Sequence, residues 1–296
     1  MDSAARITLP GLAEALASVK ALVSGCVATV SADDPGLFGP RSVSWKIFRS
    51  PAYSLSALSG LLLEALHPRA MAAIDQHSDY RRDAWRRAQR TADYVFTITF
   101  SGTGAALAAA GRVRSIHSRI RGTDPATGRA YSADDPELLL WIHCVNTEMA
   151  LLGAETFGRG LTGEEAERFV VEQVKAAELV GLERAAIPST RSEVQALIGR
   201  TPLLLSPPAR EFWNLLLRAR MPLTMRPFWV MHLAGAATLL PPEVKALYGF
   251  PRWIPSGRMN RALLRIVLRA MDLAYDFVSP IRAARRHLEK VGREAA

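Results

Sequence analysis

The stretch "DDPELLLWIHCVNTEMALLGAETF", residues 134–157, carries the pattern of one long helix. Ser132 or Asp134 ahead of Pro136 supplies its start signals, because a side-chain oxygen can cap the first backbone N–H groups and proline suits the first turn. Apolar residues then recur at the spacing of a helix and not in the alternation of a strand. The same pattern returns along most of the chain, so we expect an all-α fold.

Similar start signals occur at Thr162, at Ser189 and at Pro207. The stretches 31–42 and 122–136 are rich in Gly, Pro and Asp and are expected to be loops. The periodicity predicts helices near residues 11–24, 51–66, 69–77, 82–99, 103–121, 134–157, 162–181, 189–199, 206–219, 223–239, 241–248, 257–276 and 279–292.

The chain is expected to form a single globular multi-helix domain, because it shows no internal repeat, no low-complexity tract and no long linker. Residues 94–100, "YVFTITF", are the one short stretch rich in β-branched and aromatic residues, and they can continue the preceding helix. We expect residues 1–30 to add an N-terminal helix, residues 31–255 to form the main body, and residues 256–296 to pack on it as C-terminal helices.

The composition is 49% hydrophobic, with a net charge of +9 carried by scattered arginines. An anionic partner would explain the charge, but basic and aromatic residues do not interleave, so no nucleic acid partner is expected. Cys26 and Cys144 lie far apart in apolar surroundings, which is typical of a reduced, cytoplasmic protein. The first residues lack the basic and apolar regions of a signal peptide.

The longest apolar run, residues 227–240, is shorter than the roughly 20 residues that a membrane-spanning helix needs. It could form a buried helix or dip into a membrane surface, and the prolines around it favour burial. Peripheral membrane contact through this run and the basic terminal helix stays an alternative. No GxSxG, HExxH or phosphate-binding glycine loop occurs in the chain.

Arg87 lies on an apolar helical stripe, which we infer by taking 100° per residue. Its neighbours on that stripe are Ala84, Ala88, Thr91, Tyr94, Val95 and Ile98. A buried arginine needs an anion, which could be Asp75, Asp79 or Asp83, or else a ligand carboxylate or bound oxygen species. Arg90 could flank the same site or reach solvent.

His117 occupies the middle of a second stripe, with Ala106, Ala110, Val113 and Ile120. The small side chains beside it would let a flat group approach, and neutral imidazole is a common iron ligand in haem proteins. Arg114 and Arg121 at the edges of this face would suit haem propionates. The alternative is a core histidine that is hydrogen-bonded to the backbone.

His143, Asn146 and Thr147 follow Leu139 and Leu140 on a third stripe. Buried polar groups need partners, so this face should line a polar cavity or form a satisfied network. Direct metal ligation by His143 is not expected, because no carboxylate or second histidine lies at i+3 or i+4.

Several motifs in order resemble the oxygenase MpaB family, which includes the rubber oxygenase (latex-clearing protein) catalytic domain and the ER-bound oxygenase of mycophenolic acid biosynthesis. The similarity covers roughly residues 36–253. The motifs are "GPRSVSWKIF" (39–48), "LLLEALHPRAMAAIDQHSDY" (61–80), "WRRAQRT" (85–91), "GRVRSIHSRIRGTDPATGRAYSADDPELLLWIHCVNTEMALLG" (111–153) and "LLPPEVKALYGFP" (239–251). The resemblance implies an all-helical fold, non-covalent haem b and cleavage of C=C bonds in isoprenoid-like chains by O₂.

Carried over by motif, His117 would be the proximal iron ligand, and Arg87 and Thr91 would match an RxxxT element near the haem. Arg90 stands where the rubber oxygenase has a lysine that can occupy the distal iron position, and arginine stays protonated and does not readily ligate iron. The family's glutamate base lies upstream of the arginine, where Glu64, Asp75 and His77 are all candidates.

We therefore predict a haem pocket between the core helices of an oxygenase acting on a small apolar, isoprenoid or lipid-like substrate with O₂. Arg87, Arg90 and Thr91 would form its catalytic group. The cofactor-binding residues would be His117, Arg87, Thr91, Val113, Ala110, Arg121 and His143. A non-catalytic haem- or lipid-binding protein, peripheral to a membrane, is the alternative from another functional class.

Overall fold

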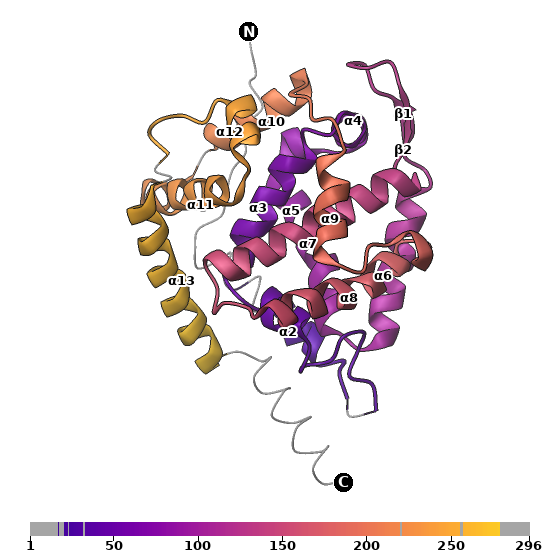
Figure 1. The fold of residues 1–296 in the computed structure, drawn as a ribbon, viewed down its shortest axis with the longest axis vertical. Coiled ribbons are helices and arrows are strands. Elements are labelled where there is room, and N and C mark those ends of the chain that lie inside the picture. The colour runs from indigo at the N-terminus through magenta and orange to yellow at the C-terminus, as the bar shows by residue number, and fades with distance from the viewer. Residues whose placement is uncertain are drawn as a thin grey trace.

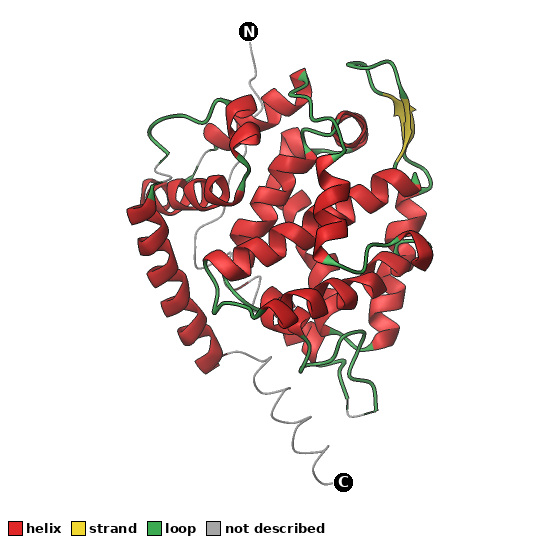
Figure 2. Ribbon diagram, in the orientation of Figure 1, coloured by secondary structure: helices red, strands yellow, loops and turns green. Residues whose placement is uncertain are grey.

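The computed structural model describes residues 17, 21–22, 24–31, 33–219, 221–254 and 257–278, with the side chains of 274–278 left out. Figures 1 and 2 show a body made of packed helices, with one short hairpin projecting from it. The α-helices are α2 (Val43–Phe48), α3 (Tyr53–Glu64), α4 (Pro68–His77), α5 (Tyr80–Phe100), α6 (Thr103–His117), α7 (Pro136–Thr156), α8 (Gly163–Leu179), α9 (Arg191–Gly199), α10 (Pro207–Leu217), α11 (Arg226–Leu239), α12 (Pro242–Tyr248) and α13 (Arg258–Val278). The all-α prediction is confirmed.

Helix α7 crosses the middle of the molecule and packs along α3 (Figure 1). The two helices approach closely because α7 presents Gly153 to Ser56, where an added Cβ would overlap the serine hydroxyl. Helix α11 approaches α3 in the same way, with Gly235 against Leu55. Small residues at these crossings bring three helices together around a shared apolar core.

Helices α5 and α6 form an antiparallel hairpin that turns at Ser101 and Gly102. Residues 94–100 are helical, as predicted, and end α5. The predicted helix 103–121 ends at His117 instead, where Ser118 forms the C-cap and the N–H of Ile120 turns back to the carbonyl of His117. The predicted stripe therefore stops at His117, and Arg121 lies beyond the helix.

The segment 122–136, predicted as a loop, contains a two-stranded antiparallel hairpin of β1 (Arg121–Thr123) and β2 (Ala130–Ser132). Asp124 organises its turn by accepting hydrogen bonds from the backbone N–H of Ala126 and the hydroxyl of Thr127. Gly128 supplies the positive φ that the turn requires. The strands are too short to show a period-2 pattern in the sequence.

Two 3₁₀ turns, Arg184–Ala186 (η1) and Leu223–Met225 (η2), connect longer helices. Helix α2 was not predicted, since six residues are too few to show a period. The start signals at Thr162 and at Pro207 are confirmed, whereas Asp135 and Thr190 cap α7 and α9 in place of the predicted residues.

The apolar run 227–240 forms α11, whose second half is buried against α3 and α7. No helix in the described part of the chain is long and apolar enough to cross a membrane. Most of the predicted N-terminal helix and the predicted helix 279–292 lie outside the described residues.

Candidate functional site

A carboxyl group and an amide meet where α3 and α7 cross. The side chain of Asn146 donates a hydrogen bond to Oε1 of Glu64 at 2.8 Å and a second to the carbonyl of Ile142 at 3.0 Å. Both residues belong to central helices, yet Glu64 is only half-buried and Asn146 is exposed. These polar side chains are therefore partly accessible to solvent although both helices are central.

Burial is the main influence on Glu64 and raises the pKa of its carboxyl to about 7. The positive charge of Arg87 and the hydrogen bond from Asn146 act in the opposite direction, because both favour the carboxylate. Glu64 can therefore hold or release a proton near neutral pH.

Arg87 projects from α5 into the same region, and burial lowers the pKa of its guanidinium group. The leading opposite charge on it comes from Glu64, with a smaller contribution from Asp79. Asp75 instead pairs with Arg81 at 2.5 Å. Glu64 was not among the anions expected for this stripe, because it lies much further from Arg87 in the sequence than Asp75, Asp79 and Asp83 do, and only its place in a family motif signalled it.

Thr91 and Arg90 sit at the exposed side of α5. The Thr91 hydroxyl donates to the carbonyl of Arg87 at 3.3 Å, one helical turn back. Arg90 forms an ion pair with Asp79 at 2.8 Å and remains largely exposed. Of the three residues predicted as the catalytic group, Arg87 is the one that the structure brings beside Glu64.

His117 is the last residue of α6 and is half-buried. Its ring makes no hydrogen bond within the described part of the chain, and its Nδ1 is buried without a partner. Burial lowers the pKa of the imidazole, against a weaker opposing effect of Asp134, so the ring is neutral at pH 7. A core histidine kept for structure would be expected to have a hydrogen-bond partner.

Tyr94 adds a second buried polar group on the α5–α6 side, since its hydroxyl also has no hydrogen-bond partner among the described residues. Burial raises the pKa of this phenol to about 12, so it stays protonated and able to donate. An unpaired buried hydroxyl and an unpaired buried ring nitrogen are each costly, and both occur on this hairpin.

The remaining residues of the predicted haem face differ in how far they are buried. Ala110 is fully buried in a cluster that includes Ile98, Ala176 and Leu179. Val113, one turn further along α6, is only half-buried. Arg121 is exposed and lies 3.5 Å from Asp134.

Arg114, predicted at the edge of the haem face, is directed to the end of α8. Its Nη1 donates to the carbonyl of Leu179 at 2.7 Å. This contact satisfies a carbonyl at a helix C-terminus, where cationic side chains are favoured.

His143 lies one turn before Asn146 on α7, and burial lowers its pKa to about 4, so it is neutral. Thr147 donates its hydroxyl to the backbone carbonyl of His143 at 2.8 Å, a bond within the helix. No group of three or more His, Cys, Asp or Glu side chains capable of holding a metal ion occurs among the described residues.

Two other histidines have structural roles, whereas His77 is exposed at the end of α4. His67 caps α4 by accepting the N–H of Ala70 at 3.3 Å, and its ring contacts Trp141. The ring of His232 lies 3.0 Å from the hydroxyl of Ser54, which joins α11 to α3.

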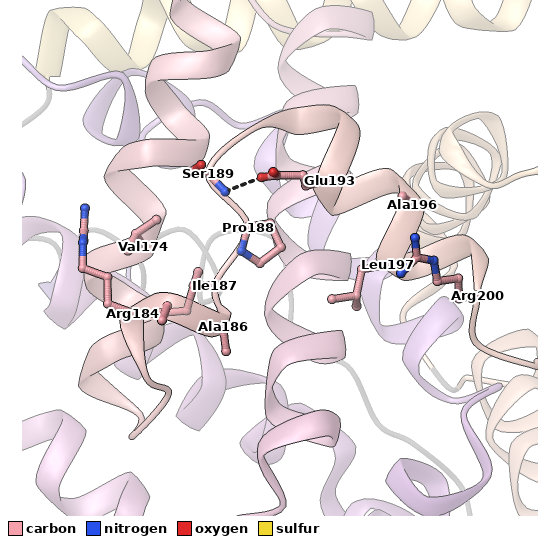
Figure 3. Close-up of a pocket in the computed structure, with 11 residues that line it drawn as sticks. Val174, Arg184, Ala186, Ile187, Pro188, Ser189, Glu193, Ala196, Leu197 and Arg200 are labelled. Atoms are coloured by element: carbon pink, nitrogen blue, oxygen red, sulfur yellow. Dashed lines mark hydrogen bonds between the residues drawn. The ribbon is translucent and has the colours of Figure 1, made fainter.

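A hollow of about 600 Å³ lies between α8, η1 and α9 (Figure 3). Its walls include Val174, Ile187 and Leu197, with Arg184 and Arg200 at the sides. Glu193 accepts the N–H of Ser189 at 2.9 Å, so this carboxylate is engaged in holding the loop before α9. None of the predicted site residues lines this hollow.

Residues 45–272 match the family model described as "ER-bound oxygenase mpaB/B'/Rubber oxygenase, catalytic domain". The matched region spans about three quarters of the chain and runs from α2 into α13. No curated protein and no solved structure was found to match the chain. The match contains Glu64, Arg87, His117 and Asn146, the residues that the helices position here, and the chain belongs to this oxygenase catalytic-domain family.

Proposed function

We propose that this protein is a haem b-dependent oxygenase that uses O₂ to oxidise or cleave a C=C bond of a small apolar, isoprenoid or lipid-like substrate. His117 would hold the iron. The observation that carries the proposal is the imidazole of His117, which is neutral, half-buried and without a hydrogen-bond partner among the described residues. Membership of an oxygenase family supplies the reaction class.

The residues present fit a haem group. Neutral imidazole is the form that ligates iron, and the lowered pKa of His117 keeps the ring in that form. Arg87 lies 13 residues before the end of α5 and His117 lies 14 residues after the start of α6. At about 1.5 Å of rise per residue, Arg87 and His117 each lie about 20 Å from the turn of the α5–α6 hairpin. The two residues are therefore at the same height along the paired helices.

When bound, haem would supply O₂ binding and activation at its iron. The chain supplies the charges around that reaction. Arg87 offers a positive charge where burial strengthens its electrostatic effect. Glu64, with a pKa of about 7, can accept or return a proton at its free Oε2, while Asn146 holds Oε1.

The other predicted residues would have supporting roles in this proposal. Val113 would border the haem beside His117, and Ala110 would hold α6 against α8. Arg121 would reach a propionate, and Thr91 would fix the backbone from which Arg87 projects. His143 would line the site as a neutral ring.

Arg90 would stay at the edge of the site, since it is exposed and paired with Asp79. A protonated guanidinium group does not readily ligate iron, so Arg90 would not hold the haem. We place the protein in the cytoplasm because Cys26 and Cys144 are buried, free thiols, as a reducing compartment keeps them.

Haemin titrated into the purified protein tests the proposed ligand. The wild type is expected to give a Soret band, and His117→Ala is expected to lose it. The His117 ring has no protein partner among the described residues, so its removal should leave the far-UV circular dichroism unchanged. His77→Ala, at an exposed histidine, is the matched control and should keep the band. An unaltered band in His117→Ala would remove this assignment.

Oxygen uptake separates the oxygenase from a haem-binding protein without turnover. The haem-loaded wild type is expected to consume O₂ when a short isoprenoid alkene is added. Glu64→Gln should keep the Soret band and lower the uptake, because the amide cannot exchange a proton. A full Soret band with no uptake on any apolar alkene would favour the non-catalytic alternative.

A further inference from the structure

Helix α13 exposes a continuous apolar stripe on the face opposite to the one that packs on the protein. Its inner face buries Leu264 and Leu268. Its outer side carries four large apolar side chains with high exposed fractions. They are Met259 at 86%, Leu263 at 52%, Ile266 at 67% and Leu273 at 64%. Taking 100° per residue, these four lie within about 80° of one another.

Arginines follow one flank of this stripe. Arg258 and Arg269 are exposed, and on the helix they lie between the outer stripe and the inner face. The one acidic side chain described on α13, Asp272, is turned inward and pairs with Arg159 at 2.6 Å. The outward side of the described helix is therefore apolar and basic.

An exposed aromatic residue and an exposed basic residue precede α13 in the sequence. Trp253, five residues ahead of the helix, is 55% exposed, and Arg252 beside it is exposed too. Tryptophan and arginine suit a membrane interface, because both combine an apolar body with a polar or charged tip. In Figure 1, α13 runs along the left margin of the molecule, away from α5 and α6.

We propose that the outer face of α13, which we define as Met259, Leu263, Ile266 and Leu273 with Arg258 and Arg269, docks on an anionic membrane surface. An interfacial helix needs an apolar face that enters the headgroup layer and cations that meet the lipid phosphates. The face has both, on a helix whose opposite side is already fixed to the protein.

A second copy of the chain fits this face less well. A specific dimer buries about 800 Å² on each partner over about 20 to 30 residues, and the stripe is one row of side chains about 21 Å long. The face also has no carboxylate among its described residues to meet the arginines of a partner. Charge complementarity favours lipid phosphate.

Sedimentation with vesicles tests the proposal on the full chain. The wild type is expected to pellet with phosphatidylcholine vesicles that contain a third phosphatidylserine and to stay soluble with phosphatidylcholine alone. The variant Leu263→Glu/Ile266→Glu should lose pelleting. Val171→Glu, which alters an apolar side chain 48% exposed on α8, is the matched control and should pellet like the wild type.

A second variant tests whether the arginines of this face contribute to vesicle binding. Arg258→Gln/Arg269→Gln should weaken binding to the anionic vesicles by about thirtyfold, since each arginine near an anionic surface contributes roughly a factor of five. Wild-type protein that stays in the supernatant with anionic vesicles would overturn the proposal. So would a dimer in size-exclusion chromatography that Leu263→Glu/Ile266→Glu converts to monomer, because the face would then bind a second copy.

Discussion

At the scale of single residues, Glu64 connects sequence, electrostatics and proposed chemistry. It ends α3, receives a hydrogen bond from Asn146 on α7, and faces the charge of Arg87 on α5. Burial dominates these contacts and leaves the carboxyl with a pKa of about 7. A carboxyl group poised near neutrality is suited to proton transfer, and it makes stability depend on pH.

Glu64→Gln is expected to change that dependence. The folded-state pKa of Glu64 is raised from 4.5 to about 7, so the native state binds more protons than the unfolded state between these values. Wild-type stability should therefore fall as pH rises through this range, by on the order of 3 kcal/mol for this group alone. Glutamine keeps an oxygen for Asn146 and cannot ionise, so the variant should lack this fall.

Urea unfolding at pH 5 and pH 8 measures the effect. The difference in unfolding free energy between Glu64→Gln and wild type should grow in favour of the variant at pH 8. Glu243→Gln, at an exposed carboxylate of α12, serves as control and should show no such growth. If the difference in unfolding free energy from wild type changed equally with pH for Glu64→Gln and Glu243→Gln, Glu64 would ionise as it does in the unfolded chain.

At the scale of elements, glycines set how closely the helices cross. On α7, an added Cβ at Gly153 would overlap the hydroxyl of Ser56 and lie 3.1 Å from its Cβ. Gly111 on α6 has nothing within 4 Å of the same position, although it too is a helical glycine. Identical residues in similar helices thus have different packing roles.

Gly153→Ala should destabilise the protein by about 1 to 3 kcal/mol, because α3 and α7 must separate or Ser56 must move. Gly111→Ala should stabilise it by about 0.5 to 1 kcal/mol, since alanine is the better helix former and meets no neighbour there. Thermal unfolding of the two variants is the measurement. A gain in stability for Gly153→Ala would show that this crossing is looser than described.

At the scale of the whole molecule, α13 closes one end of the core. Leu264 and Leu268 join a buried cluster with Leu55 and Phe157, which come from α3 and the end of α7. Arg265 adds a hydrogen bond from Nε to the carbonyl of Thr156 at 2.8 Å. The family match likewise runs into α13, to residue 272.

The two faces of α13 should therefore respond differently to the same change. Leu264→Ala/Leu268→Ala should cost about 4 kcal/mol or more, because each buried leucine contributes about 2 to 5 kcal/mol. Leu263→Ala/Ile266→Ala, on the exposed side, should change stability by less than about 1 kcal/mol. Equal losses in urea unfolding would mean that the outer face is covered in solution.

The helices could be read from the sequence because each has its own periodicity and caps, as at Thr162 and before Pro207. Short elements lacked that signal, so α2 and the β1–β2 hairpin were not predicted. The roles of the candidate site residues stay predictions, and one of the contacts among them was not foreseen. His117, Arg87 and His143 were identified on single helices, whereas the contact of Glu64 with Asn146 joins two helices that no local pattern relates.

The sequence by itself determined the helical class, most helix positions and the polar residues on apolar stripes, since these follow from interactions within a few residues. Only the tertiary structure decided which of those residues meet. It placed Glu64 beside Arg87, ended α6 at His117, filled the space around Ala110, and left one face of α13 outside the core. The physical reason is that burial and pairing depend on packing between distant segments, whereas helix formation depends mainly on neighbours in the chain.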